Sequence, residues 1–126
     1  QNVVIYEDNK KRFFSANAPN SWICFEFKNH KVIPTNYTIR SFDYSSNGCH
    51  PKSWVIECSN DKENWEIVDE RKNCPYLNGK LISKMFNISN QTNKAFKYIR
   101  MRQTDLSWFN DYRLAFDSFE LYGILI

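Results

Sequence analysis

Hydrophobic and polar positions alternate with a period of two along most of this 126-residue chain, and helical periodicity is nearly absent. The clearest alternating segments are 31–42, 53–59, 65–67, 99–102 and 119–125, and weaker ones are 3–6, 21–27 and 80–88. Turn signals separate them, including Asn-Gly pairs at 47–48 and 78–79. About eight strands at this spacing predict an all-β fold, either a sandwich or a barrel of antiparallel sheets.

The alternation also predicts which side chains face the core. In segment 31–42, Ile33 and Thr35 share a face with Tyr37 and Ile39, and in segment 53–59 Glu57 points outward. We expect six residues to be buried: Tyr37, Ile39, Trp54, Ile56, Trp65 and Ile99. Stacking on a ligand is the alternative for the three aromatic ones, but large aromatics more often build cores.

Length and charge narrow the class of protein. Residues 1–126 fit a single domain, which we expect to be part of a larger protein. The net charge is +3, and the basic residues are interleaved with acidic ones, so no stripe suited to nucleic acid is present. No run of 18 apolar residues occurs, so the sequence predicts no membrane span.

Four cysteines stand at positions 24, 49, 58 and 74. Two of them lie inside strand-like runs, where a buried free thiol is the usual state, so we expect all four to be reduced. Three N-x-S/T sequences, at Asn36, Asn87 and Asn90, are about as many as chance gives in a chain so rich in Asn.

The sequence shows no constellation for catalysis. The histidines, His30 and His50, both lie in polar turn-like segments. Cys49 precedes His50, but no Cys spacing typical of zinc occurs, and no phosphate loop or nucleophile motif is present. We therefore expect a protein that is not an enzyme and that needs no cofactor.

Six ordered motifs cover nearly the whole chain: PNSWICFEF (19–27), VIPTNYTIRS (32–41), SWVIECSND (53–61), NW (64–65), FKYIRMRQT (96–104) and FELYGIL (119–125). In this order and spacing they resemble the discoidin family (coagulation factor 5/8 type C domains), which is galactose-binding-domain-like. The resemblance implies an antiparallel eight-stranded jelly-roll β-sandwich that acts as a binding module. It is nearest to the intracellular branch found beside BTB domains, in muskelin-like proteins and in HECT-type ubiquitin ligases.

The cysteine positions bear on the location of the protein. Secreted members of the family pair two cysteines near the domain ends, and this chain has none near residue 1 or 126. That difference favours the intracellular branch, and with it a cytoplasmic location and a role as a protein-interaction or scaffold module. The alternative is a lectin-like domain that binds a glycan, with or without a structural calcium ion.

Three loops resemble the ligand-facing loops of the family. The first, 9–20, contributes Arg12 and Phe13; the second, 43–52, contributes Tyr44, Asn47 and His50. The third, 105–113, contributes Trp108, Phe109, Asn110, Tyr112 and Arg113. Exposed aromatics flanked by Asn and Arg suit either sugar stacking or a protein hot spot. The alternative for Trp108 and Phe109 is that they fold back and cap the end of the sandwich.

The resemblance raises the possibility of one bound metal, calcium. Some carbohydrate-binding relatives hold Ca²⁺ between an N-terminal loop and a glutamate late in the domain, which Glu120 matches. Calcium takes six to eight oxygen ligands, and segment 12–18 has no acidic residue, although Glu7 and Asp8 precede it. The sequence therefore favours no metal ligands, with Glu120 as an ordinary strand residue.

Overall fold

The computed structural model describes the backbone of residues 3–7 and the whole of residues 12–126. Within these residues the chain forms ten strands and no helix. The strands are β1 (Val3–Glu7), β2 (Phe13–Phe14), β3 (Trp22–Glu26), β4 (Val32–Arg40), β5 (Trp54–Ser59), β6 (Glu66–Arg71), β7 (Ser83–Asn87), β8 (Tyr98–Gln103), β9 (Ala115–Phe116) and β10 (Ser118–Leu125). Among the described residues, therefore, no helix is present that is long and apolar enough to cross a bilayer.

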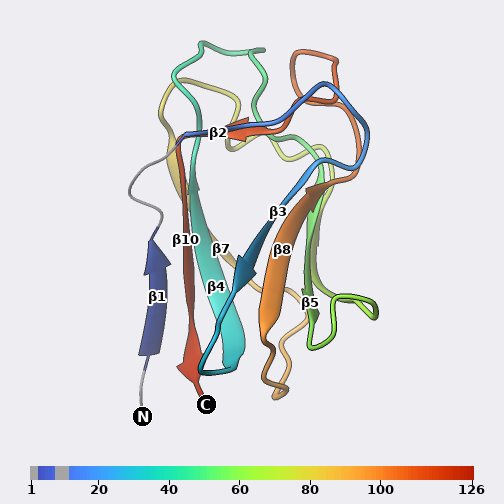
Figure 1. The fold of residues 1–126 in the computed structure, drawn as a ribbon. Coiled ribbons are helices and arrows are strands. Elements are labelled where there is room, and N and C mark those ends of the chain that lie inside the picture. Colours follow the sequence, from blue (N-terminus) through green and yellow to red (C-terminus); the bar gives the residue numbers. More distant parts are fainter. Residues whose placement is uncertain (1–2, 8–11) are drawn as a thin grey trace.

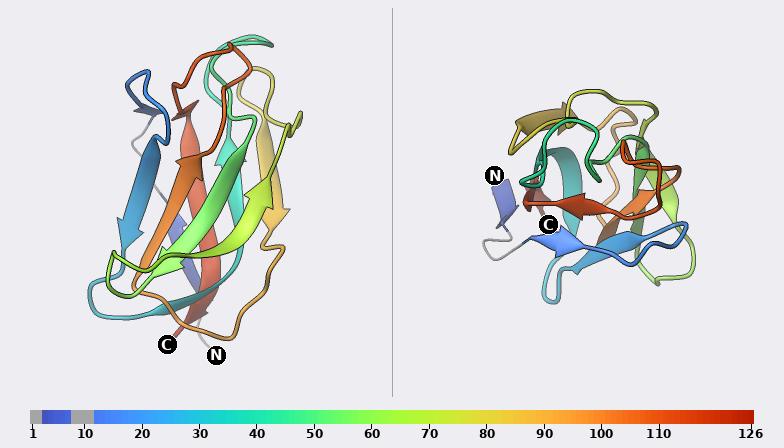
Figure 2. Two further views of the ribbon diagram at one scale, coloured as in Figure 1. Left: turned by 90° about the vertical axis from the view of Figure 1, so that its right-hand side faces the viewer. Right: turned by 90° about the horizontal axis from the view of Figure 1, so that it is seen from above.

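Eight of the strands form two antiparallel four-stranded sheets, in the orders β1-β10-β4-β7 and β3-β8-β5-β6. The sheets face each other as the two layers of a sandwich (Figure 1; Figure 2, left). The all-β jelly-roll sandwich predicted from the sequence is confirmed. Val3 pairs with Ile124 at one end of the sandwich, and the long loops gather at the opposite end.

A stack of aromatic rings fills the space between the sheets. Phe119 of β10 stacks on Phe25 of β3 and on Tyr37 of β4, with ring centroids 5.0 and 5.6 Å apart. Phe86 of β7 then stacks on Tyr37 and meets Trp54 of β5 edge-on. Five of the six residues predicted to be buried lie in this core, and the exception is Trp65.

Trp65 is half-buried on the outer face of its sheet because of a bulge in β6. Ile56 pairs with Asp69 and Glu57 pairs with Ile67, so Val68 is an extra residue opposite the two. Since side chains alternate across a strand, the extra residue reverses the faces of the positions that precede it. Val68 enters the core and Ile67 is exposed, so the inward faces predicted for Trp65 and Ile67 were wrong.

A second bulge corrects the prediction for β4. Tyr122 pairs with Asn36 and Gly123 pairs with Pro34, which leaves Thr35 as the extra residue. Val32 and Pro34 are therefore buried on the core side, in place of Ile33 and Thr35. The positions after the bulge, from Tyr37 onward, keep the predicted phase.

Glu57 lies on the outer face, as the alternation predicts, but it is buried there. Arg100 and Arg102 of β8 donate their Nε–H groups to its Oε2 atom at 2.6 and 2.9 Å. The two guanidinium groups cover the carboxylate and neutralise it, which a buried charge requires.

One polar network crosses the core. The Tyr37 hydroxyl donates to the carboxylate of Asp69, which is fully buried, and it accepts a hydrogen bond from Trp54 Nε1 at 2.9 Å. Arg71 donates to the same carboxylate from Nε at 3.0 Å, and the Ser89 backbone N–H also lies 3.0 Å from it. Burial, with the Asp69 charge beside it, raises the pKa of the Tyr37 hydroxyl far above its usual value.

All four cysteines are free thiols. Cys58 lies in the core and Cys49 and Cys74 lie in buried loop positions, whereas Cys24 is partly exposed on the outer face of β3. Burial raises the pKa of the Cys24 thiol, and burial with two nearby carboxylates raises that of Cys58 further. These thiols are therefore protonated near neutral pH.

Candidate functional site

Residues 12–20 of the first loop, together with the second and third loops, cover one end of the sandwich, and the short strands β2 and β9 pair across it (Figure 1; Figure 2, right). The first loop is held to the third because the Ser15 N–H donates to Leu114 O at 2.9 Å and the Tyr112 N–H donates to Asn17 Oδ1 at 2.8 Å. The second loop is held to the third because the Trp108 N–H donates to His50 O at 3.2 Å. Hydrogen bonds between the loops therefore hold the side chains of this end in fixed relative positions.

A cavity of about 230 Å³ opens between the second and third loops. Its lining residues are Tyr44, Gly48, Cys49, Phe109 and Arg113. Phe109 is 57% exposed and Tyr44 is 40% exposed, although large aromatics seldom remain so open to water. The cavity thus combines two accessible rings with one guanidinium group, which is the usual mixture of apolar walls and a few polar groups in a ligand site.

The first loop extends the aromatic surface beside this cavity. Phe14 is 44% exposed and lies edge-on to Tyr44 and to Phe42, with centroids 6.5 and 5.7 Å away. Arg12, also exposed, lies over the Phe42 ring at 5.1 Å and pairs with Asp117 at 3.4 Å. The first and second loops therefore form one continuous, partly cationic aromatic surface at the rim of the cavity.

Arg113 is positioned as the polar group of the cavity. Its Nε lies 3.1 Å from Asp111 Oδ2, and its side chain stays 40% exposed. The terminal nitrogens of the fork therefore remain for a ligand with hydroxyl or carboxyl oxygens. Cys49 in the cavity wall offers no nucleophile, because burial and the nearby Asp111 carboxylate raise the pKa of its thiol.

His50 supports the site from below and does not reach its surface, so its expected role as a binding residue is corrected. It is fully buried, and its Nε2 lies 2.9 Å from Tyr44 O and 3.0 Å from Ser45 O. Carbonyl oxygens only accept, so Nε2 carries the proton and holds the backbone of Tyr44. The ring therefore fixes the position of an aromatic wall of the cavity.

The sequence left open whether Trp108 and Phe109 bind a ligand or cap the end of the sandwich, and the structure places the two side chains differently. Trp108 is half-buried, donates its indole N–H to Cys74 O at 3.3 Å, and carries Lys52 Nζ over its ring at 4.5 Å. It caps the end of the sandwich, whereas its neighbour Phe109 points to solvent and lines the cavity.

The other residues predicted to bind a ligand differ in their exposure and in their distance from the cavity. Asn47 and Asn110 are exposed turn residues with φ of 66° and 59°, a left-handed conformation that Asn tolerates. Tyr112, in the third loop, is 38% exposed but does not line the cavity. Phe13 is half-buried, stacks on Phe116 at 5.3 Å and packs against the core, so its expected role in binding stays a prediction.

Sequence reasoning missed Gly48 and Cys49 as walls of the cavity. Their position depends on a tight turn in which the Gly48 N–H donates to Ser45 O at 3.1 Å and the His50 N–H donates to Gly48 O at 2.7 Å. A Cβ on Gly48 would lie 2.5 Å from the Tyr44 Cβ, so the turn needs glycine there. The Asn-Gly pair at 47–48 was the available signal, and it was interpreted only as a turn.

The calcium expectation falls partly outside the described residues. Asp8, residues 9–11 and the side chain of Glu7 are not described, while the Glu120 carboxylate accepts a hydrogen bond from the Tyr122 hydroxyl. In the described part of the chain, no three side chains of His, Cys, Asp or Glu gather as metal ligands.

Solved structures with the same architecture identify the fold. An F5/8 type C domain from Bacteroides fragilis superposes with a TM-score of 0.66 at 18% identity, covering 89% of this chain and 72% of that one. The chain has the discoidin-like fold. A CBM32 module of a family 31 glycoside hydrolase from Clostridium perfringens gives 0.60 at 17% identity, covering 89% and 76%. A chitosan-binding module of a Paenibacillus chitosanase/glucanase gives 0.58 at 20% identity, covering 89% and 75%.

No family model and no curated protein matches this chain in sequence. The solved structures confirm the discoidin-like resemblance inferred from the motifs at the level of the fold. Its narrower assignment to an intracellular branch stays a prediction.

Proposed function

We propose that this chain is a non-catalytic carbohydrate-binding module that holds a glycan at the loop end of the sandwich. The observation that carries the proposal is the cavity lined by the exposed rings of Tyr44 and Phe109 together with Arg113. Sugar rings have an apolar C–H face that stacks on aromatics, and hydroxyl groups at their rim that accept hydrogen bonds from arginine.

Two further observations support a glycan over the protein partner that the sequence favoured. The cavity is concave and small, whereas stable protein interfaces are broad, with roughly 800 Å² buried on each partner. Solved structures with this fold include modules described as CBM32 and as chitosan-binding. The aromatic surface of Phe14 and Phe42 beside the cavity suits further sugar units of an oligosaccharide.

A glycan array tests the proposal, with galactosides, N-acetylhexosaminides and chitosan oligosaccharides, each with calcium and with EDTA. We expect the wild-type protein to bind a defined subset. Phe109→Ala should weaken that binding about 30-fold, since a buried aromatic anchor contributes about 2 kcal/mol. Its melting temperature should stay within about 2 °C of wild type, because the ring is exposed.

Tyr76→Ala is the matched control, since Tyr76 is 56% exposed and lies outside the cavity. It should bind glycans as wild type does. Failure of the wild-type protein to bind any glycan would overturn the proposal and return the protein-partner hypothesis to first place. Equal binding by Phe109→Ala and wild type would also reject this site.

An intracellular, cytoplasmic location is a separate proposal. The four free thiols support it, because cysteines remain reduced in that compartment. Fractionation of cells that express the native protein tests it, and recovery from the medium or an oxidising compartment would reject it.

A further inference from the structure

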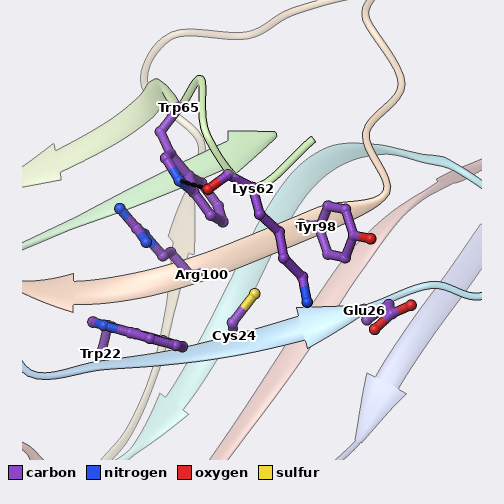
Figure 3. Close-up of a pocket in the computed structure, with 7 residues that line it drawn as sticks. All are labelled: Trp22, Cys24, Glu26, Lys62, Trp65, Tyr98 and Arg100. Atoms are coloured by element: carbon purple, nitrogen blue, oxygen red, sulfur yellow. Dashed lines mark hydrogen bonds between the residues drawn. The ribbon is translucent and has the colours of Figure 1, made fainter. Parts of the chain in front are cut away.

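A second groove lies on the outer face of the sheet β3-β8-β5-β6, away from the loop-end cavity (Figure 3). Its volume is about 290 Å³, near the lower end for small-molecule sites. The residues that matter for its chemistry are Trp22, Cys24, Lys62, Trp65, Tyr98 and Arg100. None of them lines the loop-end cavity, so the two hollows are independent.

Two indole rings flank the groove and are fixed by one guanidinium group. Arg100 lies over the Trp65 ring at 3.7 Å and over the Trp22 ring at 5.7 Å, between the two side chains in Figure 3. Its Nε donates to the buried carboxylate of Glu57 at 2.6 Å, which keeps the guanidinium in place. The indoles therefore need little ordering when a ligand binds, which lowers the entropic cost of binding.

Trp22 is open to a ligand. It is 53% exposed, and its indole N–H makes no hydrogen bond to another described residue. An exposed tryptophan beside a hollow presents a flat apolar surface with one polar donor, on which a ligand can stack.

Lys62 supplies an available charge. Its side chain reaches over the groove toward Cys24, and Nζ lies 4.9 Å from the Tyr98 ring centroid. The ammonium group forms no ion pair or hydrogen bond with another described residue. The lining holds two cations, Lys62 and Arg100, against the single carboxylate of Glu26, and Lys97 lies nearby over the Tyr98 ring at 5.6 Å.

We propose that this groove binds an acidic carbohydrate, with a sugar ring on the Trp22 indole and a sugar carboxylate on Lys62. The flat indoles suit a pyranose ring, and the unpaired ammonium group suits its carboxylate. Trp22, Cys24 and Glu26 belong to the edge strand β3, but their side chains line the groove from the face of the sheet (Figure 3), whereas an extended peptide pairs with the unpaired backbone groups of an edge strand. An acidic glycan therefore fits better than an acidic peptide.

The four indole N–H resonances of the uniformly ¹⁵N-labelled protein report on the groove directly, after assignment by Trp→Phe variants. The probes are trigalacturonate, neutral galactotriose and a hexaglutamate peptide. We expect trigalacturonate to shift the resonances of Trp22 and Trp65 and to leave that of buried Trp54 in place. The apparent affinity should fall as NaCl is raised, since the lysine contact is exposed.

Lys62→Gln should weaken trigalacturonate binding about three- to fivefold, the upper part of the range for an exposed charge pair. Lys72→Gln is the matched control, because Lys72 is an exposed lysine paired with Glu70 away from the groove, and it should bind as wild type. The absence of shifts at Trp22 and Trp65 overturns the proposal, and so does unchanged affinity in Lys62→Gln. Equal shifts with galactotriose or hexaglutamate also overturn it.

The proposals for the loop-end cavity and for the outer groove can be rejected independently of each other. Phe109→Ala should keep the trigalacturonate shifts at Trp22, and Lys62→Gln should keep the pattern of the glycan array. Loss of both kinds of binding in either variant would reject the independence of the groove.

Discussion

The buried hydroxyl of Tyr37 offers the sharpest test of how the core is held together. Tyr37→Phe removes one oxygen and leaves the stacked ring on Phe86 and Phe119 in place. The change deprives the Trp54 N–H of its acceptor and the buried Asp69 carboxylate of one donor. Each unsatisfied group costs about 1–3 kcal/mol, but Asp69 keeps two other partners.

The expected loss in free energy of unfolding is therefore about 2–4 kcal/mol at pH 7. For a domain of this size that lowers the melting temperature by on the order of 10 °C. Urea titration followed by tryptophan fluorescence measures the loss. Tyr76→Phe is the control, because its exposed side chain should give a change within about 0.5 kcal/mol.

The same variant has a predicted pH dependence. The pKa of Tyr37 is higher in the folded state than in the unfolded chain, so its contribution is complete below the unfolded value of about 10 and is lost as the pH rises further. The gap between wild type and Tyr37→Phe should shrink by about 1.4 kcal/mol per pH unit above that value. A gap under about 0.5 kcal/mol at pH 7, or one that is constant up to pH 11, would refute the network as described.

Three further predictions concern other parts of the molecule. In the native state iodoacetamide should alkylate Cys24 alone, slowly at neutral pH because its pKa is raised, and faster as pH rises because more of the thiol becomes thiolate. Intact-mass analysis should show four adducts in denaturant, and more than one native adduct would contradict the burial of the other three cysteines. Burial alone would raise the pKa of Glu57, but hydrogen bonds from two arginines outweigh burial and lower it. The stabilisation from the Glu57 carboxylate is therefore present above pH ~4.3 and is lost as the pH falls. The urea midpoints of wild type and Glu57→Gln should converge below pH ~4, and a difference that stays constant with pH would contradict this prediction. Gly123→Ala should lower the free energy of unfolding by about 1–3 kcal/mol, because the new Cβ would lie 2.6 Å from the Ile33 carbonyl oxygen. Gly79→Ala should lower it less, because the new Cβ meets only the flexible end of a side chain, and equal losses in a thermal melt would disprove the clash.

The presence of the strands could be predicted from the sequence because each sheet packs one face against a continuous core, which makes hydrophobic and polar residues alternate along its strands. Alternation in β5 and β8 is regular, so Trp54, Ile56 and Ile99 were assigned to the core. The bulges at Thr35 and Val68 were not predictable, because one inserted residue leaves the local composition unchanged while it reverses the faces beyond it.

The site was predictable only in part. The loops stood out because they break the alternation, and three of their residues, Tyr44, Phe109 and Arg113, line one cavity. Which of two adjacent aromatics faces solvent depends on distant partners, as the carbonyl of Cys74 shows for Trp108. The outer groove was missed because Trp65 was assigned to the core and Trp22 was treated as an ordinary strand residue.

The pairing of Val3 with Ile124 has a consequence for how the domain works when joined to other sequence. Both ends of the described chain leave from the pole opposite the loops, so an attached segment at either end would not obstruct them (Figure 1). If the loops bind a glycan as proposed, copies linked in tandem would each keep their loops accessible, and a glycan-coated surface would be able to engage several of them at once. Avidity of this kind can exceed single-site affinity by about 10²- to 10⁴-fold, so weak individual contacts would suffice for firm attachment.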